Sequence, residues 1–115
     1  MEPRERYDEL VDDLCARNDD VEPSQMMGMP CVKRGGNMVI GFAAGKGLAK
    51  NEQAEEAMVF KLPDPEAHAR ALGLAGAHLF DPGGKGRPFK EWVVVPFAHE
   101  AEWESFAHDA LKRAG

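Results

Sequence analysis

The chain has 115 residues and a formal net charge of −6, a size that fits one compact domain and leaves little room for two. With 43% hydrophobic residues, it can bury a modest core without help from disulfides or metals. No stretch approaches the roughly 18 to 20 apolar residues of a membrane span, and the acidic N-terminus lacks the pattern of a secretory signal. We therefore expect a cytoplasmic protein that makes no membrane contact.

The negative charge is concentrated at the start of the chain. Residues 1–25 carry nine acidic and three basic residues, and this difference accounts for the whole net charge. The other ninety residues carry eleven of each sign, so the body of the domain is neutral. A strongly basic nucleic-acid footprint is absent, and duplex binding starts at a disadvantage because it depends largely on neutralising phosphates.

The first predicted element is a helix over residues 3–18. Apolar side chains recur there at the spacing of one helix face, namely Tyr7, Leu10, Val11, Leu14 and Cys15. Acidic residues dominate the opposite face. We predict that this acidic helix, together with a linker containing Val-Glu-Pro-Ser, makes up residues 1–25.

A β-hairpin is predicted next. Two short apolar runs, 29–34 and 38–43, flank Gly35-Gly36-Asn37, and glycine and asparagine tolerate the positive φ that tight hairpin turns require. Pro30 has no N–H to donate, so we expect it at a strand start or on a sheet edge.

Residues 44–56 are predicted to form a long polar loop. The elements expected after it are a strand over 57–62, a helix opened by Pro65, a short strand over 77–80, a glycine-rich loop, a strand over 91–95 and a helix over 99–113. The consecutive valines of the 91–95 strand indicate burial on both faces. The order α-β-β-β-α-β-β-α predicts a single α+β domain over residues 1–115, in which a mostly antiparallel sheet packs against helices.

Three pieces of the sequence, in this order and spacing, resemble a known family. Met27-Gly28-Met29-Pro30 precedes the glycine-turn hairpin, Phe60-Lys61-Leu62 precedes a proline-started helix, and Gly84-Lys85-Gly86-Arg87-Pro88-Phe89-Lys90-Glu91-Trp92 leads into the valine strand. Together they resemble the N-terminal domain of the TfoX/Sxy family and, more distantly, the YjbR/MmcQ-like small proteins, over about residues 26–111. The resemblance implies the fold of that domain, and it does not imply an enzyme. The segment 44–56 is longer here than in that pattern.

The glycine-rich loop over residues 81–90 contains Lys85, Arg87 and Lys90. A nucleotide-binding P-loop needs G-x-x-x-x-G-K-[ST] between a strand and a helix, whereas here Arg87 and a proline follow the glycines and a strand comes next. The pattern therefore favours a loop that joins two strands and whose glycines allow unusual φ values. A contact of its three basic residues with an anion stays open as an alternative.

No catalytic, cofactor or metal site is predicted. None of the four histidines has the spacing of a zinc motif, and Glu104 and His108, four residues apart on the last helix, lack a third ligand. Neither serine lies in a nucleophile elbow, and we expect Cys15 and Cys31 to be structural thiols. Either core packing or a partner-binding face is expected for four methionines around the hairpin, Met26, Met27, Met29 and Met38.

The first functional hypothesis is a small non-enzymatic domain that serves as a regulatory or protein-interaction module. Its acidic helix would attract a basic partner, and a homodimer is another form that such contacts take. The alternative is nucleic-acid binding through a basic loop patch beside an aromatic ring that bases can stack on. Its residues are Lys33, Arg34, Lys85, Arg87, Lys90 and Trp92, and this alternative requires the fold to bring them onto one face. A small-molecule binder is a third hypothesis, for which the sequence offers no residues.

Overall fold

The structure is a computed structural model, and it describes residues 2–26, 29–44, 56–80 and 89–112. Their elements, in chain order, are α1 (Pro3–Arg17), β1 (Val21–Met26), β2 (Met29–Arg34), β3 (Asn37–Ala44), β4 (Glu56–Lys61), α2 (Pro65–Leu72), β5 (His78–Phe80), β6 (Phe89–Pro96), the 3-10 turn η1 (Phe97–His99) and α3 (Glu100–Lys112). The strands form a six-stranded antiparallel sheet in the order β1-β2-β3-β4-β6-β5. The predicted α+β class, with an antiparallel sheet packed against helices, is confirmed.

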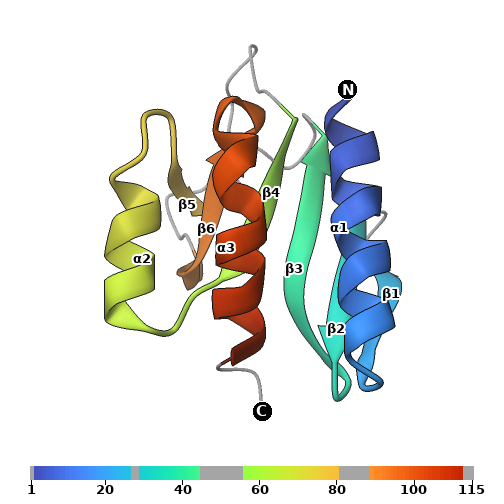
Figure 1. The fold of residues 1–115 in the computed structure, drawn as a ribbon. Helices are drawn as coiled ribbons and strands as arrows, with labels where there is room; N and C mark the ends of the chain where they lie inside the picture. The colour runs from blue at the N-terminus through green and yellow to red at the C-terminus, as the bar shows by residue number, and fades with distance from the viewer. Residues whose placement is uncertain (1, 27–28, 45–55, 81–88, 113–115) are drawn as a thin grey trace.

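All three helices lie on the same face of the sheet (Figure 1). Their apolar stripes and the facing strand residues make one buried cluster, to which Leu14 of α1, Ala71 of α2 and Phe106 of α3 contribute. Trp103 of α3 is fully buried, and its indole Nε1 donates a hydrogen bond to the main-chain oxygen of Val95 at 3.1 Å. This cluster is the helix-side core, and the indole hydrogen bond fixes α3 to the end of β6.

Residues 21–26 differ from the prediction. We expected a linker there, and this was wrong, because the segment is strand β1 and pairs along its whole length with β2. β1 is an edge of the sheet, where Pro23 is tolerated because no second neighbouring strand needs its missing N–H. The side chain of Val21 anchors the strand in the helix-side core. The predicted loop 44–56 lies outside the described residues, except for its two ends, which belong to β3 and β4.

A β-bulge in β3 changes which of its side chains point to each face of the sheet. The register slips between the pair Val32–Ile40 and the pair Lys33–Met38, so Val39 is an extra residue on β3. As a result, Val39 and Ile40 are both buried in the helix-side core. Met38 pairs with Lys33 and points with it to the opposite face of the sheet.

The face of the sheet opposite the helices, here called the second face, has an apolar cluster of its own. Its buried members are Ala43, Ala57, Val59, Phe80 and Val94, with Met29 and Trp92 packed against them. Val93 and Val95 belong instead to the helix-side core. The predicted burial of the valine strand on both faces is therefore confirmed.

Candidate functional site

Three lysines and one tryptophan lie at one end of the sheet, and the side chains of Lys33, Lys61 and Trp92 point to its second face. Neighbouring side chains of a strand point to opposite faces, and residues beside them on β2, β4 and β6 belong to the helix-side core. Those core neighbours are Val32, Phe60 and Val93. We call this outward set, Lys33, Lys61 and Trp92, together with Lys90 at the same end of β6, the lysine face.

Strand pairing puts these residues at similar positions along the strand direction, near the same end of the sheet. The core residues Val32, Ile40, Phe60 and Val93 form one row of paired positions across β2, β3, β4 and β6. Lys33 lies one residue beyond this row, and the paired residues Lys61 and Trp92 lie one residue beyond it in the same direction. Because neighbouring strands are about 4.8 Å apart, the backbones at Lys33 and Lys61 are roughly 10 Å apart and those at Lys61 and Trp92 roughly 5 Å. Lys90 lies two residues further along β6, in the stretch where the register with β5 shifts between the pairs Leu79–Val93 and Phe80–Phe89.

The lysines of this face differ from the arginines in their ion pairing. All five arginines of the described chain pair with carboxylates, as Arg4–Asp8, Arg6–Glu9, Arg6–Glu100, Arg17–Asp13, Arg34–Asp20 and Arg70–Asp109. By contrast, Lys33, Lys61 and Lys90 form no ion pair with any described residue. Glu22 is the cross-strand partner of Lys33, yet no ion pair joins them. Three positive charges are thus available to a ligand at this end of the sheet.

Three of the six residues predicted for the basic patch are not among the lysine-face residues, namely Arg34, Lys85 and Arg87. Arg34 points to the helix side, where its Nε lies 2.9 Å from Asp20 Oδ2 and its Nη1 donates to the main-chain oxygen of Leu111 at 2.8 Å. It links β2 to α3, and two of its guanidinium nitrogens are held by these partners. Lys85 and Arg87 lie outside the described residues.

Of the predicted patch, the structure brings together Lys33, Lys90 and Trp92, and it adds Lys61. Sequence reasoning missed Lys61, although the predicted strand 57–62 contains it. Alternation along that strand predicts that Lys61 points away from the face of Phe60. Which strands lie beside Lys61 depends on the tertiary pairing of β4 with β3 and β6, and the sequence does not give that pairing. The signal available in the sequence was the lysine itself, at the end of an otherwise apolar strand.

The two cysteines are free thiols. Burial raises the pKa of the Cys31 thiol, and Lys33 and a hydrogen bond with Ser24 oppose the rise. Burial also raises the pKa of Cys15, and the carboxylate of Asp12 adds to the effect. Because nucleophilic catalysis needs the thiolate, a raised pKa disfavours that role for either cysteine.

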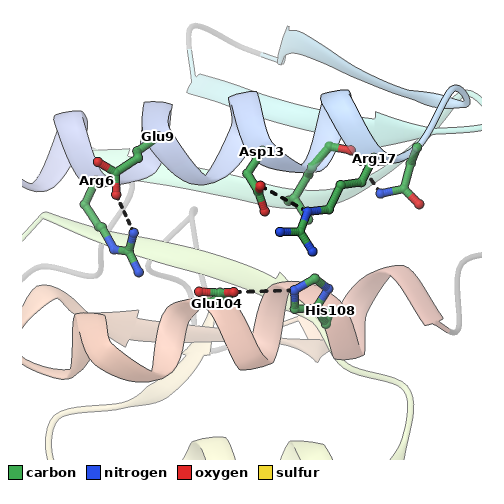
Figure 2. Close-up of polar contacts among 8 residues, drawn as sticks. Arg6, Glu9, Asp13, Arg17, Glu104 and His108 are labelled. Carbon is green, nitrogen blue, oxygen red and sulfur yellow. Dashed lines mark hydrogen bonds and ion pairs between the residues drawn. The ribbon is translucent and has the colours of Figure 1, made fainter.

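The predicted Glu104–His108 pair is present on α3 and faces α1, with His108 Nε2 3.8 Å from Glu104 Oε2 (Figure 2). Within residues 2–26, 29–44, 56–80 and 89–112, no group of three or more His, Cys, Asp or Glu side chains is placed to hold a metal ion. The facing side of α1 has ion pairs of its own, Arg6–Glu9 at 2.6 Å and Arg17–Asp13 at 3.1 Å. Arg6 also pairs with Glu100 of α3 at 3.0 Å, so an ion pair joins the two helices directly.

The other three histidines each bind a main-chain carbonyl. His68 Nε2 lies 2.7 Å from Lys90 O, His78 Nδ1 lies 3.1 Å from Gly76 O, and His99 Nε2 lies 2.7 Å from Ala75 O. Since a carbonyl oxygen only accepts, the bonded nitrogen of each ring carries the hydrogen. The His68 bond joins α2 to the start of β6 and so positions the main chain at Lys90.

No family model, curated protein or solved structure matches this chain. The resemblance to the TfoX/Sxy and YjbR/MmcQ-like proteins therefore stays a prediction. None of the helices in the described part of the chain is long and apolar enough to cross a membrane.

Proposed function

We propose that the domain is a binding module that contacts the phosphate backbone of nucleic acid through the lysine face. The observation that supports this best is the separation of charges on the described surface. The described arginines are held in ion pairs, whereas Lys33, Lys61 and Lys90 pair with no described carboxylate and lie at one end of the sheet. A lysine ammonium group binds phosphate as a point charge and needs no fixed two-pronged geometry.

The net charge of −6 does not oppose this proposal, because most of the excess acids lie on the other side of the sheet; Glu22, the cross-strand partner of Lys33, is the exception. Residues 1–25 carry the whole excess, and α1, which holds much of it, covers the other face of the sheet (Figure 1). Exposed charges separated by more than a Debye length, about 8 Å at physiological salt, are largely screened from each other. A ligand at the lysine face therefore experiences the nearby lysines more strongly than the acidic helix.

A single strand suits this face better than a duplex. Three lysines neutralise few phosphates, so charge alone gives limited affinity and a second contribution is needed. Trp92 is half-buried against the second-face cluster, and its cross-strand partner is Lys61. Stacking of an unpaired base on an aromatic ring contributes about 1–3 kcal/mol per base, and duplex bases are not free to stack in this way.

Titration of a fluorescently labelled single-stranded oligonucleotide at several salt concentrations, followed by anisotropy, tests the proposal. Three phosphate contacts predict that log K falls with log salt with a slope near −2, or about −0.7 per contact. Lys33→Gln, Lys61→Gln and Lys90→Gln should each weaken binding and reduce the slope by about 0.7. Arg17→Gln removes the same charge from α1 and should leave binding unchanged. Absence of salt-sensitive binding at low ionic strength would reject the proposal.

A second candidate is a protein-interaction module, favoured by acids at the junction of α1 and β1. Asp12, Asp19 and Glu22 are exposed and form no ion pair with described residues. Asp12 and Glu22 both raise the pKa of the Cys15 thiol, so each carboxylate lies in the neighbourhood of that thiol. Such an acidic patch attracts a basic partner, and the attraction falls as salt rises.

Pull-down from native lysate at low and high salt compares the wild-type domain with an Asp12→Asn, Glu22→Gln double variant. A basic protein that only the wild type retains, and that salt releases, supports the second candidate. Lys61→Gln is the matched control, because β4 lies three strands away from β1 in the sheet and the variant should retain the same partner. Equal recovery by the wild type and the double variant argues against an interaction through these acids.

A further inference from the structure

Three sulfur-containing side chains meet around Gly41 on the second face. A β-carbon added to Gly41 would lie 2.7 Å from Met29 Cε, 3.6 Å from Met29 Sδ and 3.0 Å from Met38 Cε, so both methionine side chains occupy the space over this glycine. Cys31 pairs directly with Gly41 across β2 and β3. Met29 lies two residues before Cys31 on β2 and shares its face. One thiol and two thioethers therefore surround a single position of the sheet.

The β-bulge creates this arrangement. In a regular strand, residues three apart point to opposite faces, and Met38 would then enter the helix-side core. Because Val39 is an extra residue, Met38 and Gly41 point to the same face. Gly41 itself has no side chain to separate the two methionines.

We infer that Cys31, Met29 and Met38 form a binding site for a soft monovalent cation, with Cu(I) as the metal ion that fits. Thiolate and thioether sulfurs are the protein ligands that select Cu(I) over harder ions. Zinc sites are built from cysteine, histidine and carboxylate ligands, and no cluster of three or more such side chains occurs among the described residues. The sulfur donors around Gly41 are thus two neutral thioethers and one thiol that becomes an anion, and the hydroxyl of Ser24 is hydrogen-bonded to that thiol.

The binding step is balanced by the release of one proton. The S–H bond of Cys31 breaks, its proton goes to solvent, and an S–Cu bond forms, while each methionine sulfur donates a lone pair. The product of one thiolate and one Cu(I) ion is neutral. This suits a side chain that is only 1% exposed, because an uncompensated charge would be costly there. The metal enters as Cu(I), so no oxidant or reductant is consumed.

Anaerobic titration with Cu(I) against a competing chelator, repeated with redox-inert Ag(I), tests the site. We expect one metal ion per chain and at least a hundredfold loss of affinity in Cys31→Ser. Met29→Leu and Met38→Leu should each weaken binding at least tenfold, although leucine preserves apolar volume. Two controls should bind as the wild type does: Cys15→Ser, and Met58→Leu, which changes a buried methionine of the helix-side core.

A measurement on the wild type alone keeps the test independent of whether the variants fold. The methyl groups of the methionines give separate NMR signals, and Ag(I) should shift those of Met29 and Met38 while that of Met58 stays in place. The inference is overturned if these two signals do not move. It is equally overturned if folded Cys31→Ser binds Cu(I) as tightly as the wild type.

Discussion

Arg34 on β2 donates a hydrogen bond from Nη1 to the main-chain oxygen of Leu111, near the end of α3, at 2.8 Å. The Nε atom of the same guanidinium lies 2.9 Å from Asp20 Oδ2, just ahead of β1. The last carbonyls of a helix lack partners within the helix, and Arg34 supplies one across the core. One side chain therefore joins β2, the α1–β1 turn and the C-terminal turn of α3, while its neighbour Lys33 points to the second face.

Replacing Arg34 should cost stability and leave ligand binding intact. Arg34→Ala removes a charge-assisted hydrogen bond and a half-buried ion pair, so the free energy of unfolding should fall by about 1.5–3 kcal/mol. Arg34→Lys should recover only part of the loss, because an ammonium group lacks the planar fork that serves two partners. Urea unfolding measures both. Arg17→Ala, whose pair with Asp13 is more exposed, is the control and should cost less than about 1 kcal/mol. Equal losses in the Arg17 and Arg34 variants would show that the link to α3 adds no stability.

The hydroxyl of Tyr7 is buried and has no hydrogen-bond partner in the described part of the chain, while its ring packs against Phe42 with centroids 5.2 Å apart. Leaving a buried polar group unsatisfied carries a desolvation cost. Tyr7→Phe keeps the ring and removes that cost, so the free energy of unfolding should stay level or rise by about 1 kcal/mol. Tyr7→Leu, which also removes the ring contact, should be clearly destabilising. A loss of stability in Tyr7→Phe would mean that the hydroxyl has a partner.

Tyr7 should also make the fold sensitive to alkali. Burial raises the pKa of Tyr7 far above its usual value, with the Cys31 thiol adding and Arg4 opposing. The unfolded chain ionises this tyrosine near pH 10, whereas the folded chain keeps the proton. The contribution of Tyr7 to the free energy of unfolding is therefore complete below about pH 10. Above that pH, the free energy of unfolding falls by about 1.4 kcal/mol per pH unit for one proton.

Urea unfolding between about pH 9 and 11 measures this loss, and Tyr7→Phe should have the shallower slope. The raised pKa values of Cys15 and Cys31 destabilise the fold in the same direction at high pH. Both thiols are present in the wild type and in the variant, so the difference between the two slopes isolates the tyrosine. Parallel slopes in the two proteins would refute the assignment.

Most helices and strands could be predicted because local periodicity and turn chemistry determine them. The stripe of α1, the glycine turn and the valine run of β6 each contain their own signal. β1 could not be predicted in the same way, because Glu22, Pro23 and Ser24 leave Val21 as its only buried, described side chain. It is a strand because β2 lies beside it, and that contact is tertiary.

The lysine face could be predicted only in part, for a related reason. Lys33, Lys90 and Trp92 were named from the sequence, but membership of a common face depends on strand order and register. Arg34 follows Lys33 directly and therefore points the other way. Lys61 joins the face because β4 pairs with β6. The bulge at Val39, which places the methionine sulfurs, arises from the packing of two consecutive apolar residues into one core.

The turn between β2 and β3 offers a local test of how the sequence determines the fold. Gly35 and Gly36 have φ values of 59° and 87°, and the residues before and after them are paired, so this is a two-residue turn with positive φ at both positions. Asparagine adopts this region more easily than other side chains do, so Gly35→Asn should be nearly neutral. Gly36→Val should lower the free energy of unfolding by about 1–2 kcal/mol.

The cost at Gly36 should come from φ alone, because nothing lies within 4 Å of a β-carbon added there. Gly73 is the matched control, since its φ is −75° and the nearest atoms to an added β-carbon are at an ordinary 3.5 Å. Gly73→Ala should be neutral or slightly stabilising, because it reduces the freedom of the unfolded chain without strain in the folded one. Thermal unfolding of the three variants gives the ranking. If Gly36→Val is no less stable than Gly73→Ala, positive φ at this turn does not determine the hairpin.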